Sequence, residues 1–175
     1  MNRRLQAGLF LLVAAVAGLA GYYLKHASLS SPASEAAAQK LMLASLTDLN
    51  GKVQAFSQWQ GKTLVVNYWA TWCPPCREEI PALKKVHGKY ASNGVEVVGI
   101  ALDNVAKVRE YAAELGIDYT LLIAGAETLT LSKELGNQAG VLPYTVVLDR
   151  TGKVAYTHAG ALTEAALDAV LTPLL

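Results

Sequence analysis

Apolar and polar stretches alternate along most of the chain in a way that predicts strands and helices in turn. Two continuous apolar runs, Thr63–Trp69 and Val95–Ala101, are typical of buried strands. A helix is expected between them, from about Pro74 to Tyr90, and apolar residues recur at helical spacing over Asn104–Leu115. Strands that alternate with helices predict an α/β sheet that is covered on both faces.

Hairpins are predicted on either side of this central part. Leu41–Leu46 and Lys52–Ala55 surround an Asn-Gly turn signal, and Tyr144–Leu148 and Val154–His158 surround a second turn that ends in glycine. The other expected elements are a short strand at Thr120–Ile123, a helix at Glu127–Leu135 and a last helix capped by Thr163.

The N-terminal segment differs from the rest. Leu5 to Leu24 contains no charged residue, and as a helix it would cover roughly 30 Å, enough to cross the hydrocarbon core of a bilayer. Arg3 and Arg4 precede it, which favours a cytoplasmic N-terminus. We therefore expect a membrane anchor over residues 1–26, with a cleaved signal peptide as the alternative. Either interpretation places the remainder in an oxidising compartment.

The rest of the chain divides into two parts. Residues 27–40 are rich in Ser and Ala and show no clear hydrophobic stripe, so we interpret them as a linker that is partly helical through Ala36–Ala38. Residues 41–175 are long enough for one globular domain. The formal net charge is +1, and basic residues form no stripe, so nucleic acid is not expected as a partner.

The chain's two cysteines stand in Trp72-Cys73-Pro74-Pro75-Cys76, directly after the first buried run. A cysteine at the start of a helix meets unpaired N–H groups and the positive end of the helix dipole, which favour its thiolate. We expect Cys73 to be the exposed nucleophile and Cys76 to be the more buried, resolving cysteine. Because prolines lack an N–H, Pro74 and Pro75 leave few donors to Cys73, so we expect a moderately lowered pKa, as suits a reductant.

Other interpretations of the two cysteines are weaker. A structural disulfide over so short a loop would stabilise the fold little. A closed zinc site needs four ligands, and the three histidines are scattered along the sequence. A peroxidase motif would require a proline where Asn67 stands. Reversible dithiol chemistry without another cofactor is therefore the preferred hypothesis.

Two segments of the chain form a recognisable pattern, VVNYWATWCPPCREEIP at 65–81 and VLPYTVVLD at 141–149, the second followed by Gly152. In these segments the chain resembles the membrane-anchored thioredoxin-like proteins of the TlpA, ResA and CcmG type. The resemblance implies a thioredoxin fold, with a central mixed sheet flanked by helices, an N-terminal β-hairpin extension and a central insertion at about residues 103–125.

The resemblance also implies roles for residues away from the cysteines. Pro143 would be a cis-proline that faces the dithiol and exposes the Leu142 backbone to substrates. Asn67 stands where thioredoxin has a buried aspartate, and Asp103 is our candidate for a replacement acid, although a helix N-cap is an equally good interpretation of it.

Several side chains near the dithiol are expected to have ordinary structural roles. Trp69 and Trp72 should pack around the site, and Trp69 is also a natural core residue. Arg77, Glu78 and Glu79 are expected to form a solvated first helical turn.

The function expected from these features is an exported, membrane-tethered thiol:disulfide oxidoreductase that acts as a reductase. It would sit on the bacterial inner membrane facing the periplasm, receive electrons from a membrane thiol carrier of the DsbD or CcdA kind, and reduce disulfides of exported proteins, with apocytochromes of cytochrome c biogenesis as one class. The alternatives are a copper-handling module that uses the cysteines with His158, and a general dithiol oxidant.

Overall fold

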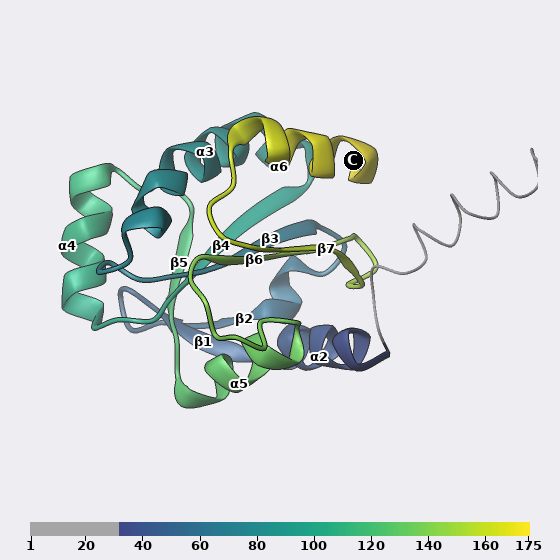
Figure 1. The fold of residues 1–175 in the computed structure, drawn as a ribbon, viewed down its shortest axis with the longest axis horizontal. Coiled ribbons are helices and arrows are strands. Elements are labelled where there is room, and N and C mark those ends of the chain that lie inside the picture. The colour runs from purple at the N-terminus through teal and green to yellow at the C-terminus, as the bar shows by residue number, and fades with distance from the viewer. Residues whose placement is uncertain (1–31) are drawn as a thin grey trace, which may run out of the picture.

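The computed structural model describes residues 32–175, which form a mixed sheet with helices on both faces (Figure 1). The sheet has seven strands in the order β2-β1-β5-β4-β3-β6-β7. The strands are β1 (Ser45–Asp48), β2 (Val53–Ala55), β3 (Thr63–Trp69), β4 (Val95–Ala101), β5 (Thr120–Ile123), β6 (Tyr144–Leu148) and β7 (Val154–Ala159). The helices are α2 (Pro32–Leu43), α3 (Pro74–Tyr90), α4 (Val105–Leu115), α5 (Ala126–Glu134) and α6 (Glu164–Leu171), with short 3-10 turns at Phe56–Trp59, Ala91–Asn93 and Thr172–Leu174.

Strand β3 lies at the centre of the sheet and carries the cysteines at its carboxyl end. It pairs in parallel with β4, Val66 opposite Val98, and antiparallel with β6, Val66 opposite Val146. All seven residues of β3 are buried, as its unbroken apolar sequence predicts for a strand covered on both faces. The expected bounds of β3, β4, β5 and β6 agree with the structure.

Successive residues of each central strand point to opposite faces, so the sheet separates two cores. One core contains Val65, Trp69 and Val147 and packs beneath α3, α4 and α6. The other contains Val66, Tyr68 and further residues that pack against α2 and α5. In Figure 1, α3 and α6 accordingly lie on one side of the sheet, and α2 and α5 on the other.

Helix α2 corrects the expected linker over 27–40, as far as that segment lies within the described residues. Its side chains Ala37, Ala38 and Leu41 are each at most 1% exposed and belong to the second core. Lys40 also pairs with Glu134 of α5 at 2.7 Å. The domain therefore extends to Pro32, and β1 begins only at Ser45, after the helix.

The expected N-terminal hairpin is present, and its place in the sheet depends on the segment at 103–125. Strand β1 pairs with β2 on one side and with β5 on the other, Thr47 lying opposite Ile123. Strand β5 in turn pairs in parallel with β4. Strand β5, which follows α4, therefore joins the hairpin to the central strands.

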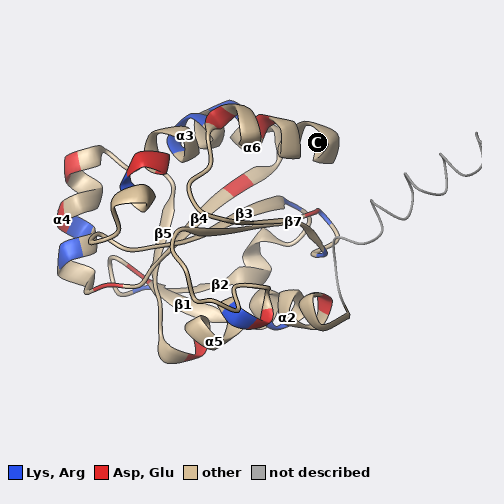
Figure 2. Cartoon of the chain, in the orientation of Figure 1, with Lys and Arg blue, Asp and Glu red and all other residues tan. Residues whose placement is uncertain are grey.

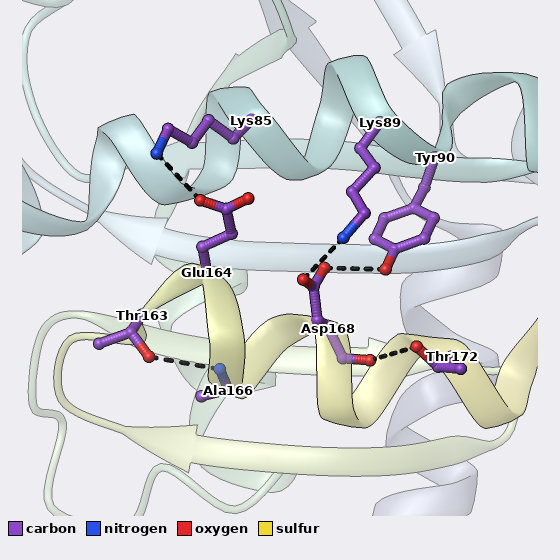
Figure 3. A network of polar contacts seen from close by, with 8 residues as sticks. All are labelled: Lys85, Lys89, Tyr90, Thr163, Glu164, Ala166, Asp168 and Thr172. Atoms are coloured by element: carbon purple, nitrogen blue, oxygen red, sulfur yellow. Dashed lines mark hydrogen bonds and ion pairs between the residues drawn. The ribbon is translucent and has the colours of Figure 1, made fainter.

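A polar network fastens α6 to the helix that begins at the cysteines (Figure 3). Asp168 accepts hydrogen bonds from the Lys89 ammonium at 2.7 Å and the Tyr90 hydroxyl at 2.8 Å, and Lys85 pairs with Glu164 at 3.0 Å. Thr163 caps α6, as expected, by accepting from the Ala166 N–H. These contacts hold the second half of α3 against α6.

The predicted anchor at residues 1–26 lies outside the described residues. Within residues 32–175, none of the helices has the length and apolar character needed to cross a membrane.

Candidate active site

The two cysteines form a disulfide at the start of α3. Their Cα atoms are 5.3 Å apart, and Cys73 is the N-cap residue of the helix. The Cys76 N–H points at the Cys73 sulfur, with 3.3 Å between nitrogen and sulfur. Pro74 and Pro75 occupy the first helical positions, where proline is tolerated because those N–H groups have no partner within the helix. Cys73 therefore receives a backbone donor and the positive end of the helix dipole.

The exposure of the two sulfur-bearing residues differs less than the sequence predicts. Cys73 is 5% exposed and Cys76 is fully buried, so in the disulfide form both are largely covered. Cys73 is the more accessible of the pair, and its neighbours Pro74 and Pro75 are exposed, with Trp72 at 65%. The expectation that Cys73 is openly exposed is therefore wrong for the disulfide form. Cys73 lies beneath the exposed apolar side chains of its neighbours Trp72, Pro74 and Pro75.

Pro143 follows a cis peptide bond at the start of β6. Its carbonyl oxygen accepts the Gly160 N–H at 2.9 Å, which connects it to the end of β7. The preceding segment is braced by Asn137, a buried side chain that accepts from the Val141 N–H and donates to the Val141 carbonyl, each at 2.9 Å. Leu142, whose backbone is predicted to pair with substrates, follows the braced Val141 and forms the cis bond with Pro143.

Glu79 is the main finding that sequence reasoning missed. It was expected in a solvated first turn, but it is 1% exposed. Its position three residues after Cys76 places both on the inward face of α3. Burial raises the pKa of the Glu79 carboxyl to about 7, although hydrogen bonds from the Leu162 N–H at 3.1 Å and the Asn67 amide at 2.6 Å act in the opposite direction. A carboxyl that titrates near neutrality is suited to accepting and releasing protons.

Asn67 ties this carboxyl to the strand of the cis-proline. Its amide nitrogen donates to Glu79 Oε1 and, at 3.0 Å, to the Thr145 hydroxyl oxygen. Thr145 lies opposite Asn67 in the β3–β6 pairing, two residues after Pro143, and is fully buried. The predicted supporting residue Asn67 is therefore part of a buried polar cluster with Glu79 and Thr145.

Asp103 lies beside the active-site loop, but its chemistry differs from that of Glu79. It accepts a hydrogen bond from the Thr71 hydroxyl, and Asn104, not Asp103, is the N-cap of α4. Partial burial disfavours the charged form of Asp103, but hydrogen bonds from Thr71 and the Asn104 N–H outweigh it and hold its pKa below the ordinary value. Asp103 is therefore a charged brace of the loop at neutral pH, and Glu79 is the better candidate for the proton-transfer acid.

The two predicted tryptophans have different surroundings. Trp69 is fully buried and lies next to the Tyr111 ring, whereas Trp72 is the exposed side chain beside Cys73. The copper alternative with His158 is not supported by the geometry: within residues 32–175, no three His, Cys, Asp or Glu side chains are placed to hold a metal ion. His158 instead stacks on Tyr156 of the same strand.

A cysteine pair at the start of a helix, together with a cis-proline just before the strand that pairs with β3, is typical of a thiol-disulfide oxidoreductase with a thioredoxin-like fold. A family model described as Redoxin matches residues 32–171. The chain belongs to this family, and its redox group is its own cysteine pair.

Several known proteins share the sequence and the fold. The thioredoxin-like protein YneN of Bacillus subtilis is 31% identical over 69% of this chain and 69% of its own length. The thiol-disulfide oxidoreductase ResA of Bacillus thuringiensis is 30% identical over 72% of this chain and 71% of its own. A thiol:disulfide interchange protein of Chlorobium tepidum, 31% identical, superposes with a TM-score of 0.69 over 75% of this chain and 92% of that one.

Proposed function

We propose that this protein is a disulfide reductase of exported proteins, tethered to the bacterial inner membrane on its periplasmic side. The observation that carries the proposal is the buried Glu79 carboxyl, one helical turn beyond the Cys73–Cys76 pair, with a pKa raised by burial to about 7. Such a group can take the proton that the buried Cys76 must lose to complete the exchange.

The exchange proceeds in two steps. In the reduced protein the Cys73 thiolate attacks a substrate disulfide, a mixed disulfide forms and one substrate sulfur leaves as a thiolate. Glu79 then takes the proton from the Cys76 thiol, and the resulting thiolate attacks the Cys73 sulfur. The Cys73–Cys76 disulfide forms, the second substrate thiolate leaves, and two electrons have passed to the substrate.

The proposed direction rests on the prolines between the cysteines. Among the first helical residues, Pro74 and Pro75 offer no N–H, so the Cys76 N–H is the backbone donor that points at the Cys73 sulfur. Strong oxidants are those that stabilise their reduced thiolate most, and this site has few donors with which to do so.

Location and partners follow from the N-terminal segment and from the chemistry. The uncharged run from Leu5 to Leu24 supports the anchor, and Arg3 and Arg4 before it support a periplasmic orientation of the domain. In an oxidising space the pair needs a source of electrons, so we propose a membrane thiol carrier of the DsbD or CcdA kind as donor. Disulfides of exported proteins, apocytochromes awaiting haem among them, are the proposed substrates, and the relatives named thiol-disulfide oxidoreductase support the disulfide chemistry.

The reduction potential of the Cys73–Cys76 couple, measured against glutathione or dithiothreitol, tests the direction. We expect a value near that of thioredoxin, about −270 mV, and a value near about −120 mV would identify a general oxidant instead. Insulin reduction tests the activity: wild-type protein should catalyse it, and Cys73→Ser should not. A Leu43→Ala variant serves as control, because this residue is 84% exposed on α2, on the other side of the sheet.

A further inference from the structure

A groove of about 670 Å³ runs beside the dithiol between α3 and α4. It begins at Pro74, the residue after Cys73, and continues along the outer side of α3. Its lining combines apolar and cationic side chains, among them Pro74, Arg77, Pro81, Lys84, Tyr111 and Leu115. We call it the α3–α4 groove. One wall of the groove is therefore formed by α3, which begins at the cysteines, and the other by α4.

Arg77 is the cation of this groove that lies nearest the dithiol in the sequence. Its backbone N–H bonds to the Cys73 carbonyl at 3.3 Å, so it stands one helical turn from the nucleophile. Its guanidinium lies over the Tyr111 ring, 5.4 Å from the ring centroid, and Tyr111 is backed by the buried Trp69 at 6.1 Å between centroids. A guanidinium held by a ring in this way is oriented before any partner arrives.

The other cationic side chains of the groove are already engaged. Among residues 32–175, Arg77 forms no ion pair with a carboxylate. Lys84 donates to the Leu115 carbonyl at 2.8 Å, and Lys85 pairs with Glu164 at 3.0 Å. Glu78 is the one carboxylate among the groove-lining residues, and it forms no ion pair with Arg77. Basic positions on α3 and α4 can be followed in Figure 2.

We propose that Arg77 on its Tyr111 platform binds a carboxylate of the protein substrate, on an apolar segment that flanks the reacting cysteine and lies in the α3–α4 groove. This inference deepens the proposed function, on which it rests, by naming the substrate's chemistry. A planar guanidinium binds a carboxylate through two parallel hydrogen bonds, and the apolar lining would take the neighbouring side chains. Arg77 acts here in specificity, and the sulfur exchange itself belongs to the cysteines.

The test follows formation of the mixed disulfide in a Cys76→Ser background, where the exchange stops after its first step. Two disulfide-containing peptides are compared that differ only in carrying Asp or Lys two residues from the reacting cysteine. With Arg77 present, we expect the acidic peptide to react about five-fold faster, the equivalent of one good exposed ion pair. Arg77→Glu should reverse the preference, and Tyr111→Leu should weaken it. High salt should reduce the preference in the Arg77 protein.

Lys133→Glu is the matched control, because it makes the same charge reversal at an exposed position near the end of α5, on the other side of the sheet. Its preference should equal that of the parent protein. Circular dichroism of every variant checks that it is folded.

The outcomes separate this inference from the function on which it rests. Equal rates for the two peptides, unchanged by Arg77→Glu, overturn the role of Arg77 and leave thiol exchange intact. A preference that reverses equally in Lys133→Glu also overturns it, because the effect would then follow net charge. If neither peptide forms a mixed disulfide, the exchange chemistry fails and the inference with it.

Discussion

The two faces of the central sheet differ in chemistry although the same strands, β3 and β6, contribute to both: one face carries a buried polar cluster and the other is apolar at the same level. On the α3 face, Asn67 and Thr145 lie opposite each other, and the Asn67 amide donates both to the Thr145 hydroxyl and to the carboxyl of Glu79. One residue further along the same strands, Tyr68 and Tyr144 face the other core, which is built of aromatic and aliphatic side chains. Burial of a carboxyl is costly unless it is hydrogen-bonded or neutral. The core on the α3 face therefore accommodates a buried carboxyl beside its apolar side chains, whereas the core on the α2 face contains no buried carboxyl among the described residues.

The largest expected effect is on catalysis at the polar face. Replacing Glu79 by Gln removes the proton acceptor, and we expect the resolving step to slow by about 100-fold at pH 8, the lower end of the range for general bases. Below pH 7 the carboxyl, with its pKa of about 7, is mostly protonated and cannot accept, so the wild-type rate should rise as pH increases through about 7. Stopped-flow measurement of mixed-disulfide resolution checks this. The same inflection in Glu79→Gln would contradict the assignment.

The next effect is on stability, and it concerns the apolar face. Leu41→Ala removes a fully buried side chain of the second core, and we expect a loss of about 2–5 kcal/mol in unfolding free energy. Insulin reduction per folded molecule should stay unchanged. Leu43→Ala, in the same helix but exposed, should change stability by less than about 0.5 kcal/mol. Equal losses in the two variants, read from urea unfolding, would show that α2 is not packed as described.

The buried carboxyl should also make stability depend on pH. The pKa of Glu79 is raised from 4.5 to about 7 in the folded protein, so the folded state holds the proton more tightly than the unfolded state. The protonated Glu79 therefore contributes fully to the free energy of unfolding below pH 4.5. This contribution, roughly 3 kcal/mol in total, is lost as pH rises through about 7. The free energy of unfolding is measured for wild type and Glu79→Gln at pH 5 and pH 8. Relative to the variant, the wild type should be less stable at pH 8 than at pH 5. A constant difference would refute the raised pKa.

The smallest effect is expected at the surface that joins α2 to α5. Lys40 and Glu134 form an ion pair at 2.7 Å, with side chains 62% and 39% exposed. Such a pair contributes at most about 1 kcal/mol and is screened by salt. A double-mutant cycle with both residues changed to Ala, measured at low and high salt, checks this. A coupling that survives at high salt would mean that the pair stabilises α2 more than its exposure allows.

Much of the fold was predictable because the central strands are buried on both faces and read as unbroken apolar runs. The full extent of helix α2 and its packing into the domain were missed for a physical reason. The helix packs through Ala37 and Ala38, whose small side chains give no hydrophobic stripe, so the segment resembles a linker. Tertiary contact with α5 and the second core decides its conformation.

The site was predictable in its cysteines, in the position of Pro143 and in the importance of Asn67, but their catalytic roles stay predictions. Glu79 was missed because acidic residues early in a helix are ordinarily solvated. A signal was available in the sequence. Cys76, Glu79 and Leu83 are spaced by three and four residues, the spacing of one helical face, and a carboxyl on the buried face of α3 is unusual.

The placement of β5 has a consequence for any shortened form of the chain. Removing the residues before the turn at Phe56–Trp59 would delete α2 and the hairpin, and the sheet would then end at β5. The edge Thr120–Ile123 would present unpaired backbone groups together with leucine and isoleucine, a template for association between molecules. In the intact protein the edge strand on that side is β2, which has only three residues and offers little backbone for pairing with another molecule. We therefore expect the N-terminal hairpin to protect the sheet from edge-to-edge aggregation.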